Sequence, residues 1–301
     1  MFQGCGTALV TPFRQDHSLD EATLRRLLRR QMDGEVNFLV PCGTTGESPT
    51  LTHEEHLRVV EITVEEARGR KTAVLAGAGG YNTAEVIALA RSLANLGVDG
   101  ILSVTPYYNK PTQEGLYQHY KAIADAVPLP IVVYSVQGRT GVNVEPATLR
   151  RLAAIENIVG VKEASGNIGQ MAQIAATLPE DFTLLSGDDS ITLPLMALGG
   201  KGIISVVSNE IPAEMTQLAA CCLKGDFAGA RLIQRKYLPL MEVNFVESNP
   251  IPVKAAMAMM GLLEPVWRLP LVPPGEASRQ KIEKVLRNVN LIAGRSMHAA
   301  D

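Results

Sequence analysis

Cysteine is scarce in this sequence, and neither sign of charge dominates it. The 301 residues include four cysteines, Cys5, Cys42 and the adjacent pair Cys221-Cys222, and none of them forms a C-x-x-C motif. Four thiols in a chain of this length make no disulfide framework, so we expect a reduced, cytoplasmic protein. The formal net charge of -3 argues against nucleic acid or an acidic membrane as a partner.

Long apolar runs are also absent. No uncharged apolar segment reaches the roughly 18 residues that can span a bilayer. The segment after Met1 has no basic region and only a short apolar stretch, Thr7–Val10, before Pro12, so we expect no signal peptide. With 46% hydrophobic and 20% charged residues, the composition predicts one large α/β domain with a small appendage.

Two motif-like strings lack the residues that would give them a function. His53-Glu54-Glu55-His56 places its histidines at i and i+3, whereas a zinc-binding H-E-x-x-H helix needs i and i+4. Gly77-Ala78-Gly79-Gly80 has Asn82 where a dinucleotide-binding loop has its third glycine. A capped helix start and a turn after a strand explain these two segments.

Short apolar segments alternate with longer amphipathic ones along most of the chain. The predicted strands are Gly6–Val10, Asn37–Pro41, Ala73–Ala76, Gly100–Val104, Ile131–Tyr134, Ile158–Lys162, Thr183–Leu185 and Gly202–Val206. Predicted helices lie between them, including His53–Ala67, Thr83–Leu96, Gly115–Ala126, Glu145–Ala154 and Ile168–Leu178. Strict β–α alternation predicts a parallel sheet, and eight units fit an α/β (β/α)8 TIM barrel better than an open sheet. Because the alternation stops after Val206, we assign residues 1–224 to the barrel and 225–301 to a small C-terminal helical region.

Lys162 ends an apolar run, Ile158–Val161, that predicts a strand buried on both faces. Burial penalises the charged form of a lysine, and a neutral amine is a nucleophile that forms Schiff bases with ketones. For an isolated lysine, a solvated pair with Glu163 would be the better interpretation. Residues at the ends of other predicted strands favour the interpretation of Lys162 as a nucleophile.

Polar residues follow several predicted strands at the end where a barrel carries its active site. Thr44-Thr45 follow the second strand, Tyr134 ends the fifth, and Arg139 comes soon after it. A phenol can transfer protons during imine formation, and threonine hydroxyls can bind a keto-acid carboxylate. An arginine can bind a second carboxylate with two hydrogen bonds.

At these residues the sequence resembles the dihydrodipicolinate synthase / N-acetylneuraminate lyase family of pyruvate-dependent class I aldolases. The resemblance extends over essentially the whole chain, and the doubled threonine, the doubled tyrosine and the Gly-Arg-Thr are similar to the synthase branch. The segments that carry it are Gly43–Ser48, Thr105–Pro111, Gly138–Gly141, Gly160–Ala164 and Asn249–Lys254.

The resemblance implies a lysine-dependent condensation. Lys162 would form an imine with pyruvate, and the derived enamine would attack aspartate β-semialdehyde, giving 4-hydroxy-tetrahydrodipicolinate in lysine biosynthesis. Tyr134 would be the general acid and base, connected through Thr45 to Tyr108, which in this family reaches in from a neighbouring subunit. No metal or organic cofactor is implied, because the lysine imine is itself the electron sink.

The resemblance also implies the substrate-binding residues and the assembly. Thr44 and Thr45 would hold the pyruvate carboxylate, with backbone support near Gly187 and Ile204, and Arg139 would bind the carboxylate of the second substrate. A homotetramer built from two dimers is the assembly that the family suggests, and a shared Tyr108 requires at least a dimer.

The sequence departs from the family pattern just before Arg139. The family usually has Tyr-Asn-Val-Pro there, and this chain has Tyr134-Ser135-Val136-Gln137. Because loss of a proline frees the backbone, we expect the Arg139 loop to be less pre-organised. The KM for the aldehyde should then be raised more than the KM for pyruvate.

Feedback inhibition by lysine is a further implication of the resemblance. Regulated members bind lysine at a subunit interface, and the matching positions here are Ser48, His53, His56, Glu85 and Tyr107. A carboxylate suits the lysine amine, and histidine and tyrosine donors suit its carboxylate. Tyr81, however, stands where regulated members often have asparagine.

Two other functions remain open from the sequence. One is another aldolase or dehydratase of the same scaffold that acts on a sugar acid or on hydroxy-oxoglutarate; Arg139 argues against it, because a polyol needs neutral hydroxyl partners. The other is a catalytically silent homologue that senses lysine. The presence of Lys162, Tyr134, Thr45 and Tyr108 argues against that function.

Overall fold

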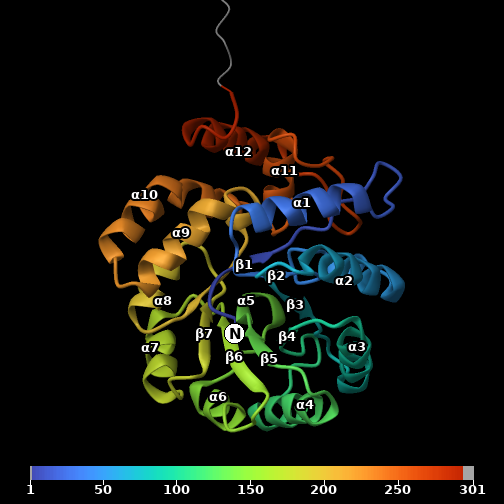
Figure 1. The fold of residues 1–301 in the computed structure, drawn as a ribbon, viewed down its shortest axis with the longest axis vertical. Helices are drawn as coiled ribbons and strands as arrows, with labels where there is room; N and C mark the ends of the chain where they lie inside the picture. Colours follow the sequence, from blue (N-terminus) through green and yellow to red (C-terminus); the bar gives the residue numbers. More distant parts are fainter. Residues whose placement is uncertain (1, 294–301) are drawn as a thin grey trace, which may run out of the picture.

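The computed structural model describes residues 2–293, and within them eight parallel strands close into a barrel (Figure 1). Each strand pairs with its neighbours in the sequence, and β1 closes the barrel against β8. The strands are β1 (Gly4–Ala8), β2 (Phe38–Val40), β3 (Ala73–Gly77), β4 (Gly100–Val104), β5 (Ile131–Ser135), β6 (Ile158–Glu163), β7 (Thr183–Ser186) and β8 (Gly202–Ser205). Each overlaps a predicted strand, so the predicted (β/α)8 barrel is confirmed.

The alternation of side chains along each strand divides them between two apolar layers. In β5, Val132 and Tyr134 belong to the cluster inside the barrel, while Ile131 and Val133 belong to the cluster between strands and helices. Every residue of β5 is buried. Burial on both faces is why these strands appear in the sequence as nearly continuous apolar runs rather than alternating ones.

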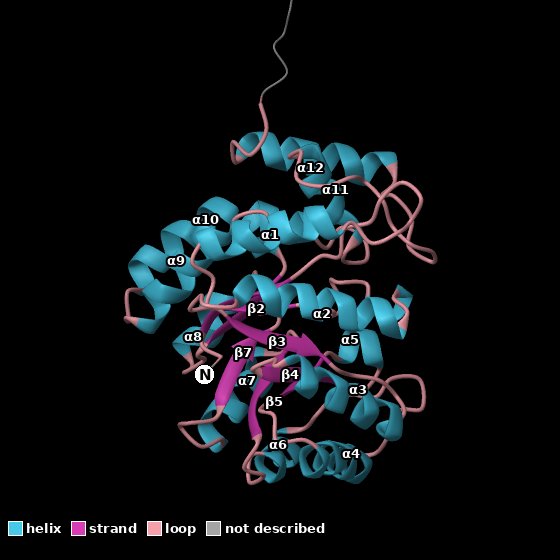
Figure 2. Cartoon of the chain, turned by 45° about the vertical axis from the view of Figure 1, so that its right-hand side comes forward, coloured by secondary structure: helices cyan, strands magenta, loops and turns pink. Residues whose placement is uncertain are grey.

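Helices surround the barrel (Figure 2), and several begin at the predicted residue. Thr52 caps α2 with a complete capping box, and Asn82 and Asn167 accept from backbone N–H groups at the starts of α3 and α7. The helices that follow the first seven strands are α1 (Glu21–Asp33), α2 (His53–Ala67), α3 (Thr83–Leu96), α4 (Gln113–Ala126), α6 (Pro146–Leu152), α7 (Ile168–Thr177) and α8 (Thr192–Ala197). Short elements in the connecting loops are η1 (Ser48–Thr50), α5 (Gln137–Thr140) and η2 (Val207–Asn209).

The chain after β8 is helical, and its last helices lie beyond α1 on one side of the barrel (Figure 1). Its elements are α9 (Pro212–Leu223), α10 (Phe227–Val243), α11 (Ile251–Met259) and α12 (Glu276–Asn288). One apolar cluster joins these helices to β1 and β8 through Cys5 and Ile203. The boundary between residues 224 and 225 stays a prediction, and residues 294–301 of that region lie outside the described residues.

No helix between residues 2 and 293 combines the length and the hydrophobicity needed to cross a membrane.

Candidate active site

Lys162 and Tyr134 lie next to each other at the carboxyl end of the barrel. The register of β5 and β6 pairs these two residues, and the Lys162 Nζ lies 4.2 Å from the centroid of the Tyr134 ring. Only 5% of Lys162 and 6% of Tyr134 are exposed. Among the described residues no carboxylate forms an ion pair with Lys162. The amine is therefore buried against an aromatic face without a charged partner.

A cavity of about 120 Å³ contains this pair. It is lined by residues from the ends of several strands and from the segment before α11: Thr44, Thr45, Tyr134, Val136, Arg139, Lys162, Ala164, Gly187, Asp188, Val206, Phe245 and Asn249. Gly187 leaves space for the lysine, because a Cβ there would lie 3.1 Å from the Lys162 Cε and 2.6 Å from the Ala164 Cβ. The cavity brings together the predicted residues Lys162, Tyr134, Thr44, Thr45, Arg139 and Gly187.

The two threonines after β2 have different environments. Thr45 is buried, and its Oγ1 accepts a hydrogen bond of 2.9 Å from the Asn249 Nδ2. Thr44 is half-buried, and its hydroxyl has no hydrogen-bond partner among residues 2–293. Thr44 also lines a neighbouring cavity of about 390 Å³. Thr45 is thus fixed by the protein, while the Thr44 hydroxyl is available to a ligand.

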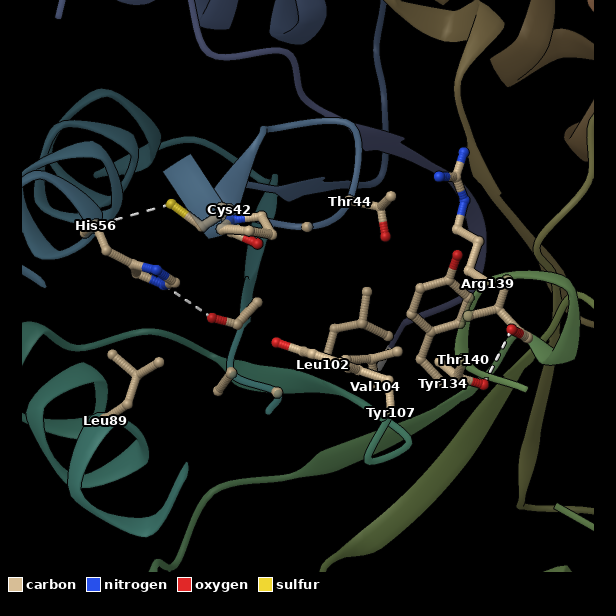
Figure 3. Close-up of a pocket in the computed structure, with 17 residues that line it drawn as sticks. Cys42, Thr44, His56, Leu89, Leu102, Val104, Tyr107, Tyr134, Arg139 and Thr140 are labelled. Atoms are coloured by element: carbon tan, nitrogen blue, oxygen red, sulfur yellow. Dashed lines mark hydrogen bonds between the residues drawn. The ribbon is translucent and has the colours of Figure 1, made fainter. Parts of the chain in front are cut away.

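Arg139 lies on the short helix α5 and lines both this cavity and the neighbouring cavity of about 390 Å³, which Figure 3 shows. Its Nη2 donates to the Asn249 carbonyl at 3.2 Å, and no carboxylate in the described chain pairs with it. The helix is held by backbone hydrogen bonds, including Arg139 N–H to the Val136 carbonyl at 3.0 Å. Most of the guanidinium's donors therefore remain available for a bound carboxylate.

Ser135 and Gln137, the two residues of this loop that depart from the family pattern, differ in burial and in hydrogen bonding. Ser135 is buried, and its Oγ accepts from the Val144 backbone N–H at 3.2 Å. Gln137 is exposed at the first position of α5, where its N–H has no acceptor among the described residues. A proline at position 137 would therefore remove no hydrogen bond from this structure.

Two predicted residues do not reach the cavity. Tyr108 is 91% exposed and has a φ of 60°, a left-handed conformation that is uncommon for tyrosine. Ile204 is buried inside the barrel, and the nearby Val206 lines the cavity instead. Within residues 2–293, Tyr134 and Thr45 share no hydrogen bond. The predicted Tyr134–Thr45–Tyr108 relay is therefore not assembled within one chain.

The residues predicted to bind lysine line two adjoining cavities. Ser48 and His56 line the cavity of about 390 Å³, whereas His53 and Glu85 line one of about 400 Å³. Tyr107 lines both of them. Figure 3 places His56 and Cys42 on the opposite side of the cavity of about 390 Å³ from Tyr134 and Arg139.

His56 and Tyr107 have environments that change how they could bind an anion. The His56 Nε2 lies 2.9 Å from the Gly77 carbonyl, and burial lowers the pKa of this histidine, which favours the neutral ring. The Tyr107 ring packs edge-on against Tyr81, with 5.2 Å between the centroids. Burial, together with Tyr81 and Glu85, raises the pKa of Tyr107, so its hydroxyl stays protonated as a donor.

Sequence reasoning missed Asn249 and Phe245 as residues of the site. Both precede α11 and line the cavity with Lys162. Asn249 was noted only as the first residue of the segment Asn249–Lys254, in the region assigned outside the barrel. Its contact with Thr45 spans 204 residues of sequence, and no local pattern indicates such a pairing.

The geometry defines a (β/α)8 barrel in which a lysine near the end of the sixth strand has no ion-pair partner among the described residues, and comparisons with known proteins agree with that class. The model of the dihydrodipicolinate synthetase family matches residues 1–289. A 4-hydroxy-tetrahydrodipicolinate synthase of Koribacter versatilis is 53% identical over 291 residues, covering 96% of this chain and 97% of the relative.

Solved structures give the same result. A dihydrodipicolinate synthase from Thermotoga maritima superposes with a TM-score of 0.95 at 47% identity, covering 97% of this chain and 100% of the other. A dihydrodipicolinate synthase from Cyanidioschyzon merolae with lysine bound has a TM-score of 0.93 at 40% identity, covering 97% and 99% of the two chains. This chain belongs to the dihydrodipicolinate synthetase family.

Proposed function

We propose that the chain is a lyase that condenses pyruvate with aspartate β-semialdehyde to 4-hydroxy-tetrahydrodipicolinate through a Schiff base on Lys162. The observation that carries the proposal is the environment of this lysine. Its amine is nearly inaccessible to solvent, lacks a carboxylate partner among the described residues, and lies 4.2 Å from the centre of the Tyr134 ring. A lysine in such a place is suited to form an imine with a small ketone.

In the first half-reaction the Lys162 amine adds to the keto carbon of pyruvate, and water leaves to give the imine. Loss of a proton from the methyl group converts the imine to an enamine. Tyr134 transfers protons in these steps, a role supported by the contact of its ring with the amine. The carboxylate of pyruvate binds to backbone N–H groups and to the Thr44 hydroxyl, a role supported by the lack of any partner for this hydroxyl among residues 2–293.

In the second half-reaction the enamine carbon attacks the aldehyde of aspartate β-semialdehyde, and the new alkoxide takes up a proton. The α-amino group of the adduct then attacks the imine carbon, which closes the ring and releases the Lys162 amine. Arg139 binds the carboxylate of this second substrate, with its guanidinium oriented by the Asn249 carbonyl.

The working enzyme is proposed to be a cytoplasmic homotetramer made of two dimers. Tyr108 supports a shared site. Its side chain is 91% exposed and its backbone is held at a positive φ, which costs free energy. Burial of the ring in a cavity of a partner subunit would offset that cost. Its hydroxyl would then complete the proton relay with Thr45. Four free thiols between residues 2 and 293 support a reducing compartment.

Inhibition by lysine is proposed at the two adjoining cavities, whose lining includes Ser48, His53, His56, Glu85 and Tyr107. Glu85 supplies a carboxylate for the ligand's amine, and the protonated Tyr107 supplies a donor for its carboxylate. The related enzyme from Cyanidioschyzon merolae was solved with lysine bound. Activity measured while lysine is titrated to millimolar concentration tests this, and a flat curve would rule it out.

Turnover of pyruvate with aspartate β-semialdehyde, coupled to a reductase and followed by NADPH loss, tests the proposed function. Borohydride trapping with pyruvate, read by mass spectrometry, tests the first half-reaction alone. Turnover together with an adduct on Lys162 is the expected result. An adduct without turnover would mean that the acceptor is another aldehyde, as in the sugar-acid aldolases, and no adduct would mean a catalytically silent homologue.

A further inference from the structure

A second buried lysine, Lys254, follows the cavity residue Asn249 by five positions and does not line the cavity itself. Lys254, on α11, forms an ion pair with Glu47, whose Oε1 lies 2.5 Å from the Lys254 Nζ, and both side chains are 0% exposed. The Lys254 Nζ also lies 4.5 Å from the centroid of the Phe13 ring. Burial lowers the pKa of Lys254, and Glu47 opposes that shift. Glu47 is thus the neighbour that favours the ammonium form of Lys254.

Glu47 ends the loop that carries the two threonines of the site. It has a left-handed φ of 53°, which is strained for a residue with a side chain. Its N–H donates to the Thr44 carbonyl at 3.1 Å, and the Gly46 carbonyl accepts from the Thr11 Oγ1 at 2.7 Å. Glu47 is therefore hydrogen-bonded directly to Thr44, at the end of the turn that contains both threonines.

The other anchor of this loop comes from the same C-terminal segment as Lys254. Asn249 donates to the Thr45 Oγ1 at 2.9 Å, five residues before Lys254 in the chain. Two contacts from one segment, one hydrogen bond and one ion pair, thus hold both ends of the turn Thr45–Glu47. A buried ion pair seldom stabilises a fold more than an apolar pair of the same size would. Its direction and fixed length are what an apolar pair cannot supply.

We propose that Lys254 and Glu47 are positioning residues that hold the Thr44–Thr45 turn at the place where it binds the keto-acid carboxylate. This inference rests on the proposed function, since it assigns the pair to the pyruvate step. Neither residue lines the cavity, so both act through Thr44 and Thr45. Loss of the pair should weaken the binding of pyruvate and leave the chemistry at Lys162 able to proceed.

The test uses the full chain and a double variant, Glu47→Leu with Lys254→Met, which fills the same space with apolar groups. The KM for pyruvate should rise about 10-fold or more, because small displacements of a binding group are costly. The kcat at saturating pyruvate should change much less. Borohydride trapping measured against pyruvate concentration should show the same rise in half-saturation, without dependence on the acceptor aldehyde.

The matched control is Lys121→Met with Asp125→Leu, which removes an exposed lysine–carboxylate pair on α4. It should leave both constants unchanged. A folded Glu47→Leu/Lys254→Met variant with unaltered pyruvate KM and trapping would overturn the inference while leaving the proposed function intact. An unaltered chain that traps no pyruvate would overturn the proposed function and this inference with it.

Discussion

The two buried lysines of this protein have opposite surroundings. Lys162 lies one residue before the end of β6, faces the Tyr134 ring, and has no carboxylate partner within residues 2–293. Lys254 lies on α11, also faces an aromatic ring, and is paired with Glu47. Each amine contacts a ring at 4.2 to 4.5 Å, so the carboxylate is the feature that separates them.

Burial alone therefore does not identify a reactive lysine. A paired ammonium keeps its charge in the interior and has lost its nucleophilic electron pair to the bound proton. An unpaired amine beside a cavity has neither a salt bridge to break nor a barrier of protein between it and a ligand. Lys162 is therefore suited to chemistry, and Lys254 to holding structure.

The largest expected effect is the loss of Lys162. Lys162→Ala should abolish the borohydride adduct and lower turnover roughly 1000-fold or more, because no other described lysine lines the cavity. Mass spectrometry after trapping measures this directly. Lys224→Ala, at an exposed lysine beyond α9, should retain both the adduct and turnover. An adduct that persists in Lys162→Ala would break the distinction between the two lysines.

Next in size is the cost of leaving Glu47 unpaired. Lys254→Met should destabilise the folded protein by about 3–5 kcal/mol, the range for breaking a buried ion pair from one side. Urea unfolding measures it, with Lys224→Met as the control. The double variant with Glu47→Leu should recover most of that free energy. If the single variant unfolds like the unaltered protein, the pair is not the buried anchor that its geometry indicates.

Glu210 is the acidic counterpart of Lys162, because it is a buried carboxylate without an ion pair in the described chain. Burial raises its pKa to about 8, and the Asn244 amide opposes the shift only in part. The pKa of an unfolded glutamate is about 4.3, so the folded state binds this proton more tightly than the unfolded state does. Stability should therefore fall as pH rises toward 8.

Glu210→Gln should remove most of that decline in stability between about pH 6 and pH 8. This window is chosen because burial also raises the pKa of Asp189, to about 6, so Asp189 contributes mainly below it. Urea unfolding at the two pH values measures the difference. Glu242→Gln, on an exposed face of α10, should keep the original pH dependence. Equal pH dependence in both variants would mean that Glu210 does not titrate in this window.

The smallest expected effect concerns Arg139, which lines the cavity and has no carboxylate partner within residues 2–293. Gln137→Pro should lower the KM for aspartate β-semialdehyde by roughly 2- to 5-fold, since a compatible proline removes backbone entropy worth about 0.4–1 kcal/mol. Steady-state kinetics with each substrate varied in turn measure it. The KM for pyruvate serves as the internal control and should not change. An unchanged aldehyde KM would sink the idea that this loop is under-organised.

The fold could be predicted because its signals are local. Each strand is short, apolar on both faces and followed by an amphipathic helix, so a window of sequence contains the information. The placement of Lys162, Tyr134, Thr44 and Arg139 at one rim then follows from the geometry of parallel barrels. Their assembly around one cavity is what that geometry predicts.

The contacts that hold the rim in place could not be predicted in the same way. Asn249 and Lys254 stand more than 200 residues from Thr45 and Glu47 in the sequence, and nothing local distinguishes a structural lysine on α11 from an exposed one. The contacts of the exposed Tyr108 could not be predicted from local sequence either, because its proposed site belongs to another copy of the chain.

The hydrogen bonds of Asn249 have a consequence for how such proteins can be recombined. One residue beyond the eight strands contacts Thr45 with its side chain and Arg139 with its carbonyl, and so touches both proposed substrate-binding groups. A chimera that joined this barrel to the C-terminal segment of an unrelated barrel would keep every strand and Lys162. It would lose the contacts of Asn249 that hold Thr45 and Arg139 in place. The barrel and its C-terminal helices therefore need to be exchanged together.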